Sequence, residues 1–167
     1  MSIRRVRSLA GTAPTAILGL MNDVSTAPLR QLQTALAVRT PGRCFTDLTR
    51  EIEAFVREAG ISTGLLTVFV RHTSASLLIQ ENADPDVQRD LEGFLARLAP
   101  DDPRLYVHTA EGPDDMPAHI RSALTQTSLS IPVAGGRTVL GTWQGIYLLE
   151  HRTAPHRREV VLHLIGA

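Results

Sequence analysis

Apolar residues recur with two different periods along the chain, which is the pattern of a protein that alternates strands and helices. Residues 32–38 present an apolar or β-branched side chain at every second position and predict a strand. Residues 65–71 form a continuous apolar run, which predicts a central strand buried on both faces with His72 at its end. Residues 76–80 predict a further strand.

Three segments have the period of an amphipathic helix, over residues 48–59, 85–99 and 114–125. Each begins with polar residues that can accept hydrogen bonds from the free N–H groups of a first turn. The apolar stripe of the second helix is expected to be buried. This stripe consists of Val87, Leu91, Phe94, Leu95 and Leu98.

The remaining pattern is that of short strands joined by turns. Strands are predicted over residues 105–108, 129–133, 139–141, 146–150 and 160–165. Gly135-Gly136 can adopt the positive backbone dihedrals of a tight hairpin, so the last four strands are expected to form an antiparallel meander. The sum is a single α+β domain with a mainly antiparallel sheet and helices packed on one face.

Length and composition narrow the class of protein. A chain of 167 residues suits one domain, which we place at residues 31–167, while residues 1–30 are expected to be a flexible N-terminal extension. The 17 basic and 17 acidic residues balance, so no long-range field attracts nucleic acid or a membrane surface. No apolar run approaches the ~20 residues that cross a bilayer. The single cysteine, Cys44, favours a reduced, cytoplasmic setting.

Polar side chains gather where predicted strands end. Thr73 and Ser74 follow His72, and their hydroxyls can bind phosphate or another polar ligand, although hydroxyls after a strand also serve as backbone caps. Glu81 and Asn82 follow the next strand, where a solvated turn is the alternative to a functional role.

His108 and His119 flank a short loop that could bring both imidazoles onto one metal ion. A spacing of ten or so residues is no metal motif in itself. Asp114 and Asp115 add carboxylates at a helix start, where they can also act as caps.

The C-terminal third adds polar candidates and the one tryptophan. Trp143 lies in a glycine-bounded turn, and we favour a buried structural anchor over a flat wall for an aromatic ligand. Glu150 and Arg152 are two residues apart on a strand, so they face one side, where the guanidinium of Arg152 suits phosphate. A structural ion pair is the alternative, and Gln144 is a further polar candidate.

In content and order, five motifs resemble the YjbQ-like family over about residues 32–166. The motifs are His72-Thr73-Ser74-Ala75, Glu81-Asn82-Ala83-Asp84-Pro85-Asp86, Gly112-Pro113-Asp114-Asp115-Met116-Pro117-Ala118-His119, Leu140-Gly141-Thr142-Trp143-Gln144-Gly145 and Glu150-His151-Arg152. The resemblance implies an α+β subunit that forms homotrimers, with a secondary thiamine-phosphate synthase activity that joins a pyrimidine methyl diphosphate to a thiazole phosphate.

The resemblance also implies that one site, near a subunit boundary, contains His72, Asn82, His108, Asp115, His119, Gln144, Glu150 and Arg152. His72, His108 and His119 would bind a divalent metal ion, zinc or magnesium, and Asp115 or Glu150 would move protons. Small phosphorylated substrates would be bound by Thr73, Ser74, Asn82, Gln144 and Arg152. Because histidine suits zinc better than magnesium, two alternatives stay open: a metal-dependent hydrolase of a phosphorylated or amide compound, and a noncatalytic trimer that binds a metal or metabolite.

Overall fold

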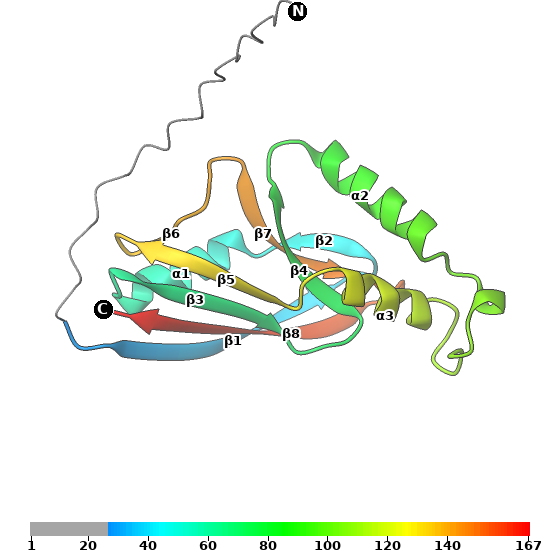
Figure 1. The fold of residues 1–167 in the computed structure, drawn as a ribbon, viewed down its shortest axis with the longest axis horizontal. Coiled ribbons are helices and arrows are strands. Elements are labelled where there is room, and N and C mark those ends of the chain that lie inside the picture. The colour runs from blue at the N-terminus through cyan, green and yellow to red at the C-terminus, as the bar shows by residue number, and fades with distance from the viewer. Residues whose placement is uncertain (1–26) are drawn as a thin grey trace, which may run out of the picture.

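Two antiparallel sheets form the body of the protein in a computed structural model that describes residues 27–167 (Figure 1). The large sheet has five strands in the order β1 (Arg30–Thr40), β8 (His156–Gly166), β3 (Thr63–Val70), β5 (Ser128–Ala134) and β6 (Arg137–Thr138). The small sheet has three strands in the order β2 (Cys44–Asp47), β7 (Gln144–Glu150) and β4 (Ala75–Glu81). The α+β class and the antiparallel pairing predicted from the sequence are confirmed.

One core fills the space between the two sheets and helix α1 (Thr49–Ala59). Ile52 and Val56 of α1 are fully buried against inward-facing residues of both sheets, such as Leu162 of β8 and Leu148 of β7. Every second residue of β8 faces this core, which follows from the two-residue period of a strand. The predicted first helix and first strand are therefore confirmed, and Gly60, in the left-handed conformation, ends α1.

The small sheet separates the predicted site residues. Ala75 of β4 lies opposite Glu150 of β7, and Glu81 lies opposite Gln144 at the other end of the same two strands. Six residues of strand span roughly 20 Å at about 3.3 Å per residue. His72, Thr73 and Ser74 thus lie at the Glu150 end, while Asn82 lies at the Gln144 end.

The prediction of an antiparallel meander formed by the last four strands was wrong. β7 leaves the large sheet and pairs with β2 and β4, while β8 returns between β1 and β3. The strand predicted over residues 139–141 is also wrong, because the Gly135-Gly136 turn places Arg137 opposite Ala134 and the pairing ends at Thr138. The strand β2 was not predicted, since its four residues are too few to show a period.

Residues 105–108 do not form the predicted strand. A 3-10 helix over Pro103–Leu105 occupies the start of this segment, and Asp102 caps it by accepting a hydrogen bond from the Arg104 N–H at 3.0 Å. Val107 is fully exposed, so its apolar side chain has no sheet to pack against.

Helix α2 (Pro85–Leu98) begins where its Asp84 cap and Pro85 predict, but its apolar stripe is not buried. Phe94 is 54% exposed and Leu98 is 51% exposed, and no residue of α2 is fully buried. Figure 1 shows α2 at the edge of the molecule, beyond β4. The period of a sequence fixes which residues share a helix face, but not what that face packs against.

Helix α3 (Asp115–Leu124) packs against the small sheet and starts close to the predicted position. Ala118 is fully buried, and the Ser122 hydroxyl donates to the backbone oxygen of Ala75 at 3.1 Å. Over residues 27–167, no helix is long and apolar enough to span a bilayer. Residues 1–26 of the predicted N-terminal extension lie outside the described residues. Its last predicted residue, Arg30, belongs to β1.

Candidate functional site

Three side chains from one loop and the helix after it form a compact group with metal-ligand chemistry. The imidazole nitrogens of His108 and His119 and a carboxylate oxygen of Asp115 all lie within 4.8 Å of one another. His119 follows Asp115 by four residues, so the α-helix places both on one face. The loop after Leu105 then brings His108 beside them, with its ring centre 5.6 Å from that of His119.

A backbone carbonyl fixes the tautomer of the neutral His119 ring. Its Nδ1 lies 3.0 Å from the carbonyl oxygen of Thr73, which can only accept, so Nδ1 carries the hydrogen. In the neutral ring Nε2 is then left with a lone pair, and this atom lies 3.4 Å from Asp115 Oδ2. Two electron-pair donors that face each other are suited to a shared cation. A histidine whose other nitrogen donates to a carbonyl is also the usual arrangement at protein metal sites.

Asp115 is the buried centre of the group, with 2% of its surface exposed. Its Oδ2 lies 2.8 Å from His108 Nε2, and its Oδ1 accepts a hydrogen bond from Arg152. The carboxylate is therefore oriented on both sides, which keeps Oδ2 turned toward the two histidines.

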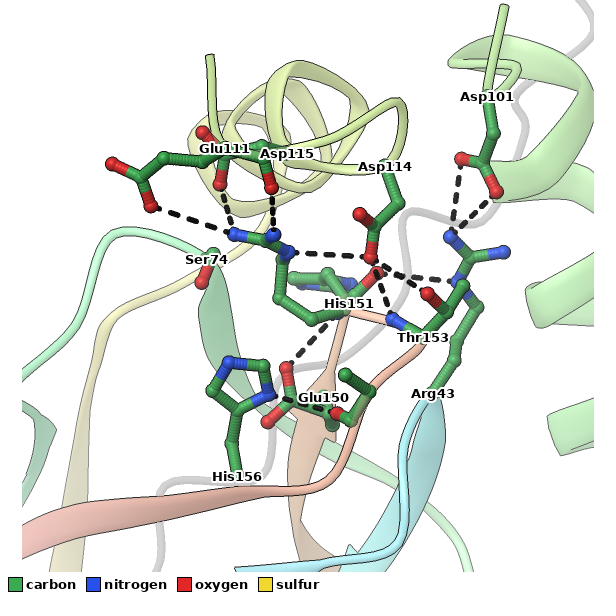
Figure 2. A network of polar contacts seen from close by, with 12 residues as sticks. Arg43, Ser74, Asp101, Glu111, Asp114, Asp115, Glu150, His151, Thr153 and His156 are labelled. Carbon is green, nitrogen blue, oxygen red and sulfur yellow. Dashed lines mark hydrogen bonds and ion pairs between the residues drawn. The ribbon is translucent and has the colours of Figure 1, made fainter. Parts of the chain in front are cut away.

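Arg152 contacts the acidic start of α3, where each of its three guanidinium nitrogens donates one hydrogen bond. Besides Asp115, it donates from Nε to Asp114 Oδ2 at 3.2 Å and from Nη2 to the Glu111 carbonyl at 2.7 Å. Figure 2 shows Glu111, Asp114 and Asp115 together at the start of α3. Arg152 therefore orients Asp115, while the phosphate-binding role expected for it stays a prediction.

Asp114 also accepts hydrogen bonds from Thr153, in the segment that follows β7. Burial acts to raise the pKa of Asp114, but hydrogen bonds from Thr153 N at 2.7 Å and Thr153 Oγ1 at 2.9 Å, together with Arg152, lower it to about 2. The carboxylate is thus ionised at neutral pH, and it locks the loop before α3 onto the end of β7.

Glu150 is buried under this group and does not reach it as a free carboxylate. It is 1% exposed and accepts hydrogen bonds from Thr40 Oγ1 at 2.9 Å and from two nitrogens of Arg158. Burial acts to raise the pKa of Glu150, but the Arg158 hydrogen bonds outweigh it and the pKa is lowered. The proton-transfer role expected for Glu150 has no support in this geometry. Glu150 forms a structural ion pair, but with Arg158 and not with Arg152.

Arg158 is the residue that sequence reasoning missed. It lies in β8, eight residues after Glu150, within the run Arg157-Arg158-Glu159 that reads as an exposed charged segment. The alternation of β8 turns Arg158 inward between two exposed neighbours, and that inward position was the available signal.

His72 and Ser74 form the other side of the site. Ser74 is buried, and its backbone N–H and hydroxyl lie 3.1 and 3.0 Å from His72 Nδ1. His72 and Thr73 line a shallow hollow of about 230 Å³ together with His119, Ser122, Ala123 and Thr127. Thr73 is exposed at this hollow, whereas Ser74 reaches it only through the ring of His72.

Asn82 and Gln144 lie apart from these residues within the protomer. The Asn82 amide donates to the backbone oxygens of Thr142 and Gln144 at 3.4 and 3.3 Å, and the Gln144 side-chain oxygen accepts from Gly141 N at 2.8 Å. Both side chains therefore shape the turn that precedes β7. Trp143 in this turn is 66% exposed, so the buried anchor expected for it was wrong.

Comparison with known protein families shows to which family the chain belongs. A model of the family described as UPF0047 protein YjbQ-like matches residues 34–167. The chain belongs to this family. It is 58% identical over 142 residues to a UPF0047 protein of Synechocystis, which covers 85% of this chain and 97% of the relative. It is 43% identical over 135 residues to the UPF0047 protein YjbQ of Escherichia coli, which covers 80% of this chain and 97% of that relative.

Solved structures of family members share the fold. A conserved hypothetical protein of Thermus thermophilus matches with a TM-score of 0.69 and 41% identity, over 77% of this chain and 97% of its own. A YjbQ/UPF0047 protein of Clostridium acetobutylicum matches with a TM-score of 0.67 and 38% identity, over 78% of this chain and 97% of its own. The two-sheet architecture is therefore that of the family.

Proposed function

We propose that this protein is a divalent-metal enzyme that acts on a small phosphorylated substrate. The observation that carries the proposal is the group of His108, Asp115 and His119, whose ligand atoms lie within 4.8 Å of one another. His119 is held by the Thr73 carbonyl with its Nε2 lone pair facing Asp115, as a metal ligand requires. The expected third histidine ligand is thus replaced by Asp115.

The ligand types favour zinc over magnesium. Two imidazole nitrogens and one carboxylate match the donors of catalytic zinc sites, which keep a fourth position for water or substrate. Magnesium prefers oxygen ligands in an octahedral arrangement. The rim of this group is open, since His108 and the adjoining hollow are exposed.

The first reaction to test is the transfer that joins a pyrimidine methyl diphosphate to a thiazole phosphate. A divalent cation held by these residues would stabilise the negative charge of the departing diphosphate. Arg152 keeps Asp115 oriented, and Thr73 and His72 line the hollow beside the metal group, where a phosphate can lie.

Hydrolysis of a small phosphorylated compound is the second candidate, and the zinc-type ligands favour it. A zinc ion held by His108, Asp115 and His119 would supply an activated water at neutral pH, and the exposed rim of the site admits water. Asp115 is the carboxylate that lies beside the histidines, whereas the carboxylate of Glu150 is already paired with Arg158.

The homotrimer remains part of the proposal, with α2 as the surface that a neighbouring copy covers. An exposed stripe with Phe94 and Leu98 at its end is costly to leave in water, and Asn82 and Gln144 stand at the far end of the small sheet. A neighbouring subunit could bring its Asn82 and Gln144 to the histidine group, which would complete the site implied by the family resemblance.

The test begins with metal content and then measures turnover. Untagged protein should bind about one zinc ion per chain, and His119→Ala and Asp115→Asn should lose it, whereas His163→Ala, which changes a histidine of β8, should keep it. Both reactions are then assayed on the zinc-loaded protein. Absence of stoichiometric metal after loading would refute the proposal, and metal binding without turnover of any phosphorylated candidate would leave a noncatalytic binding protein.

A further inference from the structure

His72 and His119 stand on the same hollow, but successive backbone groups hold them in opposite tautomers. His119 Nδ1 faces the carbonyl oxygen of Thr73, and His72 Nδ1 faces the N–H of Ser74 at 3.1 Å. A carbonyl only accepts and a backbone N–H only donates. His119 therefore carries its hydrogen on Nδ1, and His72 carries its hydrogen on Nε2.

A buried chain of hydrogen bonds strengthens this assignment for His72. Arg158 Nη2 donates to Ser74 Oγ at 3.1 Å, and arginine has no acceptor atom. The one hydrogen of the Ser74 hydroxyl is then free to point at His72 Nδ1, 3.0 Å away. His72 Nδ1 thus receives two hydrogens from Ser74. Burial, followed by the charge of Arg158, lowers the pKa of His72, which keeps the ring neutral.

This arrangement is incompatible with metal binding by His72. A metal ion on Nε2 would leave the hydrogen of the neutral ring on Nδ1, directly against the Ser74 N–H. The Nε2–H group is instead a hydrogen-bond donor that the ring offers to whatever enters the hollow. His72 is also outside the group of residues with ligand atoms within 4.8 Å.

We propose that His72 is a fixed hydrogen-bond donor to a phosphoryl oxygen of the substrate and not a ligand of the metal. The proposal rests on the metal-dependent function proposed above, because His119 belongs both to the metal-ligand group and to the lining of the hollow. A ligand there meets the metal on one side and the His72 N–H on the other. Ser74 and Arg158 act as positioning residues that set the tautomer of His72.

The tautomer is measured first, by long-range proton–nitrogen NMR of nitrogen-15-labelled protein, with His72→Gln to assign the His72 signals. We expect the hydrogen of His72 on Nε2 both without metal and after zinc loading. A hydrogen on Nδ1 of His72, in the metal-free protein or after zinc loading, would overturn the proposal. This measurement uses the unaltered protein, and it remains decisive even if zinc does not bind and the proposed function fails.

The binding role is tested with inorganic phosphate as the probe. We expect phosphate to perturb the His72 signals of zinc-loaded protein, and His72→Leu to weaken phosphate binding by about fivefold to tenfold, as for one lost hydrogen bond. His72→Gln places an amide N–H near the same position and should recover most of the affinity. Zinc stoichiometry should be unchanged in both variants. A loss of zinc in His72→Leu equal to that in His119→Ala, or phosphate affinity equal to the unaltered protein, would refute the role of His72 while leaving the metal site standing.

Discussion

Arg158 and Glu150 form a buried ion pair in which Arg158 Nε and Nη2 reach the two carboxylate oxygens of Glu150 at 2.6 and 2.5 Å. Both residues are 1% exposed, Thr40 Oγ1 also donates to Glu150 Oε2, and Arg158 Nη2 also donates to Ser74 Oγ. The pair joins β8 of the large sheet to β7 of the small sheet, directly beneath the site. It therefore links the stability of the fold to the positions of Ser74 and Arg152.

Breaking this pair should destabilise the protein strongly. Glu150→Gln or Arg158→Met leaves one charged or polar partner buried without its counterpart, which costs on the order of 3–5 kcal/mol. Thermal and urea denaturation measure the loss. Glu159→Gln is the matched control, because its exposed pair with Arg71 should contribute about 0–1 kcal/mol. Equal effects of the buried and exposed substitutions would contradict the prediction.

Stability should fall as the pH drops from about 6.5 toward about 4, in part through His151. Burial, and then the charge of Arg121, lower the pKa of His151 to about 4, while its ordinary value in an unfolded chain is near 6.5. The unfolded chain therefore binds the proton first, and the stability present above pH 6.5 is lost progressively until pH 4. The loss is on the order of 3 kcal/mol.

Urea denaturation between pH 7 and pH 4 tests this dependence. His151→Gln removes the titrating ring, so its free energy of unfolding should decrease less over this range than that of the unaltered protein. His163→Gln is the control, because His163 lies at the partly exposed surface of β8. The same slope for His151→Gln and the unaltered protein would show that His151 is not responsible.

Polar substitutions on α2 should change the assembly and leave the single chain folded. Phe94→Ser and Leu98→Ser alter side chains that are about half exposed in the protomer, so the secondary structure should persist. If α2 forms the interface of the proposed trimer, both substitutions remove apolar contacts between subunits, and sedimentation at micromolar concentration should show a lower mass than for the unaltered protein. Val139→Ser, at a similarly exposed apolar residue away from α2, should leave the mass unchanged. A trimer that survives both α2 substitutions would place the interface elsewhere.

Two glycine substitutions should have opposite effects. A Cβ added at Gly64 in β3 would lie 2.4 Å from the backbone oxygen of Ile165, so Gly64→Ala must push β3 and β8 apart and destabilise the fold. Gly93 lies within α2 with only the flexible Arg97 side chain nearby, at 3.4 Å. Gly93→Ala should raise the free energy of unfolding by about 0.5–1 kcal/mol through helix propensity. Thermal denaturation measures the stability of both variants. An unchanged stability of Gly64→Ala would contradict the close approach of β3 and β8 at this position.

The sequence by itself predicted most of the helices and strands. The alternation of β1, the apolar run of β3, the Asp84-Pro85 start of α2 and the polar start of α3 are local features. Local chain geometry is set by neighbouring residues. The four-residue spacing of Asp115 and His119 is a local feature of the same kind, because a helix puts residues with this spacing on one face.

The tertiary structure alone decided which strands pair and what each polar group faces. The move of β7 into the small sheet, the inward turn of Arg158 toward Glu150 and the exposed stripe of α2 all depend on contacts between distant segments. The sequence does not distinguish the imidazole of His72 from that of His119, and only the fold gives them different partners. Their opposite tautomers come from one N–H and one C=O of neighbouring residues, and such hydrogen-bond directions exist only once the chain is folded.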